Sequence, residues 1–204
     1  MTNKELFFKY ENSDNNIQGV DNFMGIISLR DRELFLNDVD MDTADAFNTY
    51  IRFWNKLDNE EDIATGDRKP IKIFIDSNGG DVMAACSIID TIKLSKTPVW
   101  TINIACAYSS ALEIFIVGNR RIAYPYSTFL FHEGSVNGVG GDANKFRNFS
   151  KFYDTMLEMT KENLLTHTNL TEEDYNKVKK DDWWLTAEEA LKYGMCDEIA
   201  TELM

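Results

Sequence analysis

The sequence predicts an α/β protein built around a mainly parallel sheet, and three observations carry that prediction. Two apolar runs, residues 71–75 and 99–104, have the length and composition of buried strands. Each run is followed by a segment with helical spacing, and such alternation is typical of parallel strands joined by crossover helices. The chain has 204 residues, which suits one domain with a sizeable core.

The composition disfavours several classes of function. Apolar residues make up 44% and charged residues 27%, as in folded proteins, and the net charge of −13 disfavours binding to nucleic acid or to an anionic membrane. No apolar run reaches the roughly 18 residues of a membrane span, and residues 1–16 lack a signal core, so we expect a cytoplasmic protein. Cys86, Cys106 and Cys196 are interpreted as small core residues, so we expect no metal site and no cofactor.

The N-terminal part of the chain is expected to form an arm, a strand and a helix. Residues 1–22 are polar and weakly periodic, which predicts a mobile N-terminal arm before a single domain at residues 23–204. Alternating charged and apolar residues predict a strand over residues 29–36, and residues 55–69 are expected to be a charged loop. The helix between them is indicated by apolar residues at helical spacing, namely Phe47, Tyr50, Ile51 and Trp54.

The strand that begins at Ile71 ends in a glycine pair, Gly79 and Gly80, where backbone amides can approach a ligand closely. A helix follows, whose expected apolar stripe is Val82, Ala85, Cys86, Ile89 and Ile92.

The second half of the chain is expected to add two short strands and a long helix. The strands are residues 121–124 and 128–131, and the second delivers His132 at its end. Residues 134–141 carry four glycines and are expected to be a flexible loop. Residues 142–167 are predicted to form a helix long enough to protrude from the compact body.

Ser109 lies at the turn between the strand at residues 99–104 and an apolar helix at residues 111–117. At such a turn the hydroxyl can point into a cleft, while the amide of Ser110 lies at the helix N-terminus, where amides are unpaired and the dipole favours negative charge. This position suits stabilisation of an oxyanion. The alternative is that both serines only cap a core helix.

The chain has two histidines. His167 ends the predicted long helix and is interpreted as a C-terminal cap residue. His132 follows a strand that can lie beside the one leading to Ser109, so it is the candidate base for a serine nucleophile, although a lone histidine can also be structural. Asp182 is the candidate carboxylate that would orient the imidazole.

Several separated motifs occur in a fixed order between about residue 30 and residue 199. They are Asp76-Ser77-Asn78-Gly79-Gly80, then Ala105-x-Ala-x-Ser109, then Pro125 and His132, then the segment from Asp182 to Tyr193-Gly194. Together they resemble the ClpP peptidase family, the proteolytic subunit of the Clp protease. The resemblance implies a ClpP/crotonase-like α/β fold, with repeated β-β-α units and a protruding long helix.

The resemblance also implies roles for five residues. Ser109 would be the nucleophile, His132 the general base and Asp182 its orienting carboxylate, with the backbone amides of Gly80 and Ser110 as the oxyanion hole. The implied function is a serine endopeptidase that hydrolyses peptides or unfolded proteins inside an oligomeric chamber. The implied assembly is a homo-oligomer of heptameric rings, stacked through the long helix as a tetradecamer.

An excess of large apolar residues on the long helix agrees with such an assembly, because they occupy more than one side of it. These residues are Phe146, Phe149, Phe152, Tyr153, Met156 and Met159.

The chain also departs from the family pattern. Asn78, Ala105 and Ser110 stand where the family usually has Pro, Gly and Met, and Glu133-Gly134 replaces Gln-Pro. Lys72 and Phe74 stand where the family usually has aromatic residues in a pocket for an ATPase, so no particular ATPase partner is predicted.

Three alternative functions are open at this point. One is a non-catalytic or regulatory subunit with the same fold, and another is a phage-type protease for capsid maturation. A third is a crotonase-like acyl-CoA enzyme, which also uses paired backbone amides as an oxyanion hole. The complete set of Ser109, His132 and Asp182 favours the peptidase.

Overall fold

The structure is a computed structural model that describes residues 28–135 and 141–204. The expected N-terminal arm, residues 1–22, lies outside these ranges, as does most of the expected glycine-rich loop.

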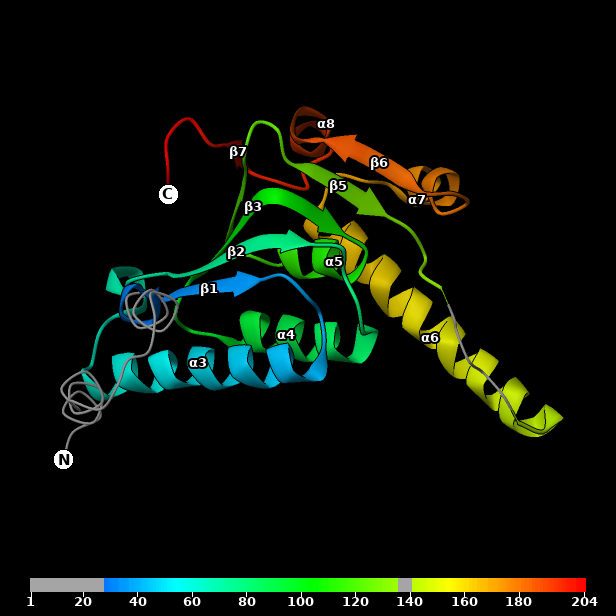
Figure 1. Cartoon of the computed structure of the whole chain (residues 1–204), viewed down its shortest axis with the longest axis horizontal. Helices are drawn as coiled ribbons and strands as arrows, with labels where there is room; N and C mark the ends of the chain where they lie inside the picture. The colour runs from blue at the N-terminus through cyan, green and yellow to red at the C-terminus, as the bar shows by residue number, and fades with distance from the viewer. Residues whose placement is uncertain (1–27, 136–140) are drawn as a thin grey trace, which may run out of the picture.

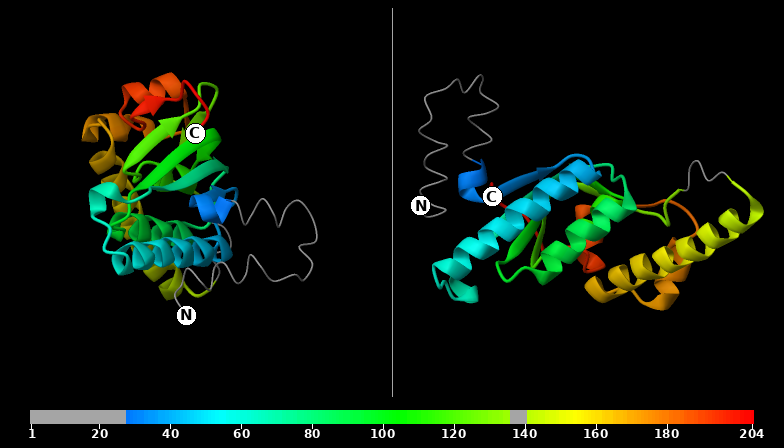
Figure 2. Two further views of the ribbon diagram at one scale, coloured as in Figure 1. Left: turned by 90° about the vertical axis from the view of Figure 1, so that its left-hand side faces the viewer. Right: turned by 90° about the horizontal axis from the view of Figure 1, so that it is seen from below.

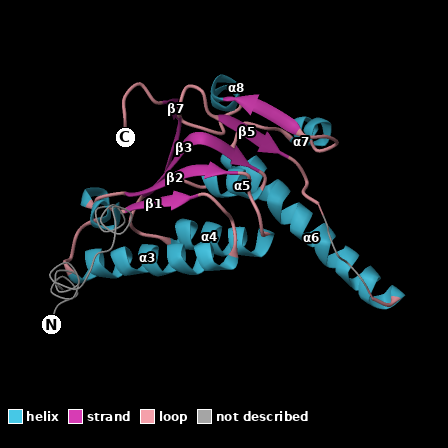
Figure 3. Ribbon diagram, in the orientation of Figure 1, coloured by secondary structure: helices cyan, strands magenta, loops and turns pink. Residues whose placement is uncertain are grey.

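A seven-stranded sheet forms the centre of the molecule (Figures 1 and 3). Five strands run parallel in the spatial order β1 (Glu33–Leu36), β2 (Ile71–Ser77), β3 (Val99–Tyr108), β4 (Arg120–Ala123) and β7 (Glu198–Ile199). The long strand β3 also pairs, near its end, with β5 (Thr128–Phe131), and β6 (Trp183–Thr186) pairs with β5 in the antiparallel sense. The predicted mainly parallel α/β sheet is confirmed.

Helices cover one face of this sheet. The long helix α3 (Met41–Glu60) and helix α4 (Val82–Leu94) lie side by side below β1, β2 and β3, and the short helix α5 (Ser110–Phe115) lies next to them (Figures 1 and 2). The remaining elements are the turn of 3-10 helix Thr65–Asp67 and the helices α6 (Ala143–His167), α7 (Glu172–Val178) and α8 (Ala187–Lys192).

The main core fills the space between the sheet and these helices. Ile71, Ile73 and Ile75 of β2 point to that side and are fully buried, because alternate residues of a strand face the same side. Phe74, between them, belongs to a smaller cluster on the other face with Ile102. The helix-covered face thus supplies most of the buried apolar surface that stabilises the domain.

The expected long helix is confirmed as α6, which extends away from the body (Figure 1). Asp142 caps its N-terminus by accepting hydrogen bonds of 2.9 and 3.1 Å from the amides of Asn144 and Lys145. Over the described residues, no helix combines the length and the apolar content that crossing a membrane requires.

The expected strand at residues 29–36 is wrong in its first half. Residues 28–31 are helical, and β1 begins only at Glu33, after Arg32 with a φ of 63°. The Arg32 guanidinium turns inward and donates to the buried Asp58 carboxylate at 2.9 Å. This contact joins the start of β1 to α3, a segment far away in the sequence.

The expected loop at residues 55–69 is also wrong in part, because α3 continues to Glu60. Two of the polar residues that suggested a loop make tertiary contacts: the buried Asp58 pairs with Arg32, and the part-buried Asn55 amide donates to Ser95 at 2.7 Å. Tertiary hydrogen bonds here override the local polarity of the sequence.

The apolar stripe of α4 is divided between two environments. Ala85 and Ile92 are buried in the core, whereas Val82 is 44% exposed. Cys86 and Cys106 are half-buried, so the expectation of three core cysteines holds only for Cys196.

Candidate active site

Ser109 lies at the turn from β3 into α5 and has a φ of 55°, which is uncommon for a residue other than glycine. Its amide donates a hydrogen bond of 2.8 Å to the carbonyl of Leu130 in β5, and this bond fixes the turn beside that strand. Because such backbone conformations persist only when the surroundings enforce them, the sharp turn is consistent with a functional position.

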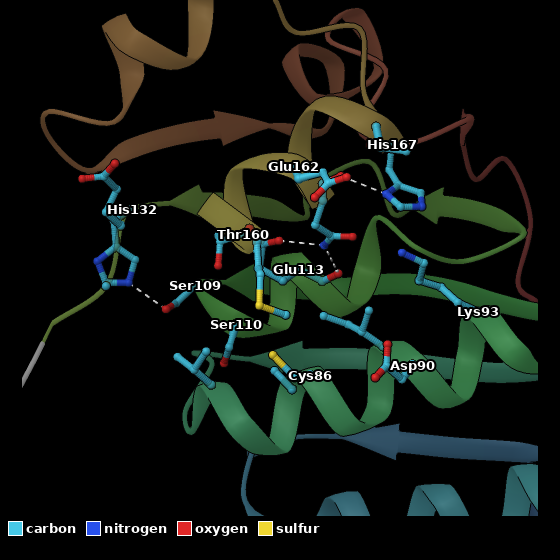
Figure 4. A pocket seen from close by; sticks show the side chains of 18 residues that line it. Cys86, Asp90, Lys93, Ser109, Ser110, Glu113, His132, Thr160, Glu162 and His167 are labelled. Atoms are coloured by element: carbon cyan, nitrogen blue, oxygen red, sulfur yellow. Dashed lines mark hydrogen bonds between the residues drawn. The ribbon is translucent and has the colours of Figure 1, made fainter. Parts of the chain in front are cut away.

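His132 follows β5, which pairs with the last residues of β3 in the register Tyr108 to Leu130. The pairing brings the imidazole to Ser109, and the His132 Nε2 atom lies 2.7 Å from the Ser109 Oγ atom (Figure 4). With Nε2 as the acceptor, the imidazole can take the hydroxyl proton.

Asp182 immediately precedes β6, whose residue Trp183 pairs with Phe131 of β5. The pairing places Asp182 beside His132, but the distance from His132 Nδ1 to Asp182 Oδ1 is 3.8 Å. That separation is too long for a hydrogen bond, and the Asp182 side chain is 58% exposed. The structure therefore brings Ser109 and His132 into contact and leaves Asp182 just outside hydrogen-bond distance.

The glycine pair lies against the Ser109 turn and leaves no room for side chains. A Cβ atom on Gly79, whose φ is 91°, would lie 2.6 Å from the carbonyl oxygen of Tyr108. A Cβ atom on Gly80 would lie 2.2 Å from the carbonyl oxygen of Val39. The close approach of three backbone segments requires both glycines.

Gly80 and Ser110 are in direct contact, through a hydrogen bond that the sequence did not indicate. The Gly80 amide donates to the Ser110 side-chain oxygen at 2.8 Å. The Ser110 amide belongs to the first residue of α5, where no intrahelical acceptor is available. Of the two expected oxyanion donors, one amide therefore already has an acceptor.

The segment after His132 is held by two tyrosines. Tyr153 of α6 donates its hydroxyl to the Glu133 carbonyl at 2.8 Å, and Tyr175 of α7 donates to the Glu133 carboxylate at 2.9 Å. Burial and the neighbouring Glu133 carboxylate raise the pKa of Tyr175. These contacts connect the position of His132 to the two helices that follow it.

Glu113 is a buried residue of the site that the sequence analysis did not single out. Its side chain accepts a hydrogen bond of 2.7 Å from Asn163 of α6, and burial raises its pKa to about 7. The available signal was a lone charged residue inside the apolar run at residues 111–117. Its partner, fifty positions away, carried no such signal.

No metal site is found in the described part of the chain, where no three His, Cys, Asp or Glu side chains could hold an ion. His167 is the last residue of α6, at the helix end where the sequence placed it, and its Nδ1 atom lies 2.8 Å from the Asn163 carbonyl.

A serine hydroxyl hydrogen-bonded to an imidazole at a strand-to-helix turn is an arrangement of the serine hydrolases as a class. The model of the Clp protease family matches residues 28–203. The chain therefore belongs to the Clp protease family.

Individual relatives agree with this assignment. An ATP-dependent Clp protease proteolytic subunit 2 from Thermobifida fusca is 31% identical over 176 residues, covering 85% of this chain and 82% of the relative. The subunit 2 of Rhodococcus jostii is 30% identical, covering 85% and 86%. That of Treponema denticola is 34% identical over 134 residues, covering 65% of this chain and 66% of the relative, just under two thirds.

The family and the names of these relatives indicate a serine-type peptidase that acts on peptides or proteins and works as part of an oligomer.

Proposed function

We propose that this chain cleaves peptide bonds with Ser109 as nucleophile, His132 as general base and Asp182 as the carboxylate that orients His132. The observation that carries the proposal is the 2.7 Å contact between His132 Nε2 and Ser109 Oγ. The same pair of side chains lies beside a cavity of about 320 Å³, large enough for one substrate side chain.

In the proposed reaction, Ser109 Oγ attacks the carbonyl carbon of the scissile bond while His132 takes the hydroxyl proton. The backbone amides of Gly80 and Ser110 stabilise the oxyanion of the tetrahedral intermediate. His132 then gives the proton to the leaving amine, and water hydrolyses the remaining acyl-enzyme ester by the same steps.

Two adjustments are needed for this reaction. Asp182 must approach His132 from 3.8 Å, and the Gly80 amide must exchange the Ser110 hydroxyl for the oxyanion. Catalytic hydrogen bonds are often long without substrate and tighten in the complex. The exposed Asp182 side chain and the short side chain of Ser110 can both move by rotation about single bonds.

We propose that the chain assembles into heptameric rings that stack as a tetradecamer through α6. Apolar side chains on this helix support an interface, because Phe146, Phe152 and Met159 are each more than half exposed in the single chain. In such a chamber the Ser109 sites would face the interior, where folded proteins cannot reach them. A heterologous interface whose rotation closes produces a ring.

The proposal extends to the setting of the enzyme. We propose a cytoplasmic peptidase with a single domain at residues 23–204 and an arm at residues 1–22. The names of the relatives contain the words ATP-dependent, which supports delivery of substrate by an ATPase.

A non-catalytic subunit is the second candidate function. The 3.8 Å gap at Asp182 and the occupied Gly80 amide favour it, since a subunit kept for assembly needs neither alignment.

Hydrolysis of a short fluorogenic peptide, which can reach the Ser109 sites without an ATPase, distinguishes the two. We expect the purified oligomer to hydrolyse the peptide, and Ser109→Ala to abolish the activity. Cys106→Ala is the matched control, because this thiol has a pKa raised to about 11 by burial and by Asp76 and is protonated at neutral pH. An inactive parent oligomer, or an active Ser109→Ala variant, would favour the non-catalytic role or another nucleophile.

A further inference from the structure

The cavity beside Ser109 has a catalytic end and a distant end (Figure 4). Ser109 and His132 lie at one end, and Lys93 and His167 lie at the other, with Glu113 between them. Polar residues make up most of the lining, and one part of the wall is formed by apolar and sulfur-bearing side chains, namely Val82, Ala85, Cys86, Ile89 and Met159. The shape therefore suits a long side chain that enters beside Ser109 and runs along apolar walls.

Glu113 puts a carboxyl group on this path. It lies one helical turn beyond Ser109 on α5, and the residue is only 9% exposed. Asn163 Nδ2 donates to its side chain at 2.7 Å and to its carbonyl oxygen at 3.2 Å. Among the described residues, no lysine, arginine or histidine forms an ion pair with it.

The hydrogen bonds of this buried pair are incomplete. Asn163 Oδ1 is buried and has no hydrogen-bond partner among the described residues. An ionised carboxylate buried without a counter-charge is costly, which is why burial raises the pKa of Glu113 to about 7. Ionisable groups that face a cavity and have a pKa shifted by burial are concentrated at binding and catalytic sites.

A cationic group delivered by a ligand would supply what the site lacks. An ammonium or guanidinium head has several N–H donors and can bind the Glu113 carboxylate and the Asn163 amide oxygen together. The aliphatic stem of lysine or arginine would lie against the apolar walls.

The other charged groups around the cavity leave it acidic. The acidic residues at its rim are Asp90, Glu133 and Glu162, and the basic or titratable ones are Lys93, His132 and His167. Lys93 is exposed and is not paired with Glu113, so it does not neutralise the buried carboxyl.

We propose that this cavity receives the side chain of the residue whose carbonyl Ser109 attacks, and that Glu113 selects a basic side chain there, lysine or arginine. This inference rests on the proposed function, and it names the substrate class of the same site. In this scheme Asn163 donates to the Glu113 carboxyl through Nδ2 and offers its Oδ1, unpartnered among the described residues, to the basic head of the ligand.

The test uses two peptidyl diphenyl phosphonates that differ only in the side chain beside the phosphorus, one with lysine and one with norleucine. Ser109 Oγ gives its proton to His132 and forms a bond to phosphorus, while phenoxide leaves and takes up a proton as phenol, so each reaction is read as a mass increase of the intact subunit. At pH 8, where Glu113 is mostly ionised, we expect the lysine probe to react about tenfold faster or more, as for other charge-assisted contacts.

Glu113→Gln keeps the side-chain volume and an acceptor for Asn163 but removes the charge, and it should reduce the lysine preference to about none. Glu188→Gln is the matched control, since it removes one exposed acidic charge on α8, outside the cavity, and should leave the preference intact. The ratio of the reaction rates of the lysine and norleucine probes with the parent protein is itself a test that needs no variant.

The outcomes are separable. A small fluorophosphonate without a recognition side chain labels Ser109 whatever the cavity prefers, so absence of that label would overturn the proposed function and this inference together. Labelling by the fluorophosphonate with faster reaction of the norleucine probe would overturn the inference alone. A glutamine probe that reacts faster than the lysine probe would show that the pair selects a neutral amide instead.

Discussion

The Gly80 amide donates a 2.8 Å hydrogen bond to the side-chain oxygen of Ser110, the residue after the proposed nucleophile Ser109. The amide proposed to stabilise the oxyanion is therefore already hydrogen-bonded within the protein. Substrate must displace this hydroxyl before the amide can stabilise a developing charge. The activation free energy of acylation should therefore include the free energy of breaking one internal hydrogen bond.

Ser110→Ala removes the competing hydroxyl, and we expect it to increase the rate of fluorophosphonate labelling by about two- to tenfold, the worth of one such bond. Ser77→Ala is the control. The Ser77 hydroxyl accepts from the Gly79 amide at 3.1 Å, in the same turn but at an amide that has no proposed catalytic role. Slower labelling of Ser110→Ala would show instead that the hydroxyl holds the turn in its reactive position.

Asp182→Asn tests whether the carboxylate acts despite its 3.8 Å distance from His132. We expect kcat/KM for a peptide substrate to fall on the order of 10⁴, because the imidazole would lose both its preferred tautomer and its stabilising charge. Asp181→Asn, at the neighbouring exposed residue, should leave kcat/KM unchanged. Equal effects of the two variants would indicate that Asp182 contributes only its charge at long range.

Phe149→Glu tests the interface proposed for α6. A charge on this apolar surface should split the oligomer, with a smaller particle in light scattering, because a carboxylate would have to be buried against the partner. We expect activity to be lost with assembly. Particles of unchanged size and activity would exclude this part of α6 from the interface.

Tyr153→Phe separates assembly from the local contact on the same helix. It keeps the ring that stacks on Phe149 at 6.2 Å but removes the hydroxyl that donates to the Glu133 carbonyl. The oligomer should remain intact while kcat/KM falls about two- to tenfold, because the segment after His132 loses one hydrogen bond. Tyr126→Phe, at a residue 99% exposed, should change neither property.

Glu113 should make stability depend on pH. Its pKa is raised to about 7 from 4.5, so the folded state holds this proton more tightly than the unfolded state. The tighter binding of this proton stabilises the folded state. Its contribution to the free energy of unfolding is complete below pH 4.5, is lost as pH rises through about 7, and amounts to roughly 3 kcal/mol at most. In urea unfolding at several pH values, the free energy of unfolding of the parent should fall relative to that of Glu113→Gln as the pH rises from 4.5 through about 7. A difference independent of pH would mean that the buried carboxyl titrates normally.

The sequence predicted the elements whose signals are local. Apolar runs located β2 and the start of β3, and the spacing of Phe47, Ile51 and Trp54 located α3. The end of α3 was missed because it depends on Asp58, whose partners Arg32 and Thr97 lie far away in the sequence. Element ends fixed by tertiary ion pairs are not visible in local composition.

The same distinction applies to the site. The contact between Ser109 and His132 could be expected because each residue follows a strand, and parallel strands bring their carboxyl ends together. The contact between Glu113 and Asn163 was missed because it joins α5 to α6 through side-chain geometry alone. The acceptor of the Gly80 amide was missed for a related reason, since a rotamer of Ser110 decides it.

The most direct test of the central claim is intact-mass analysis of the assembled protein after treatment with a fluorophosphonate. We expect one added phosphonyl group per subunit, located on Ser109 by peptide mapping, with no label on the Ser109→Ala variant and a strongly reduced rate for His132→Gln. An unlabelled parent oligomer, or equal labelling of parent and Ser109→Ala, would contradict the claim that Ser109 and His132 form the catalytic centre.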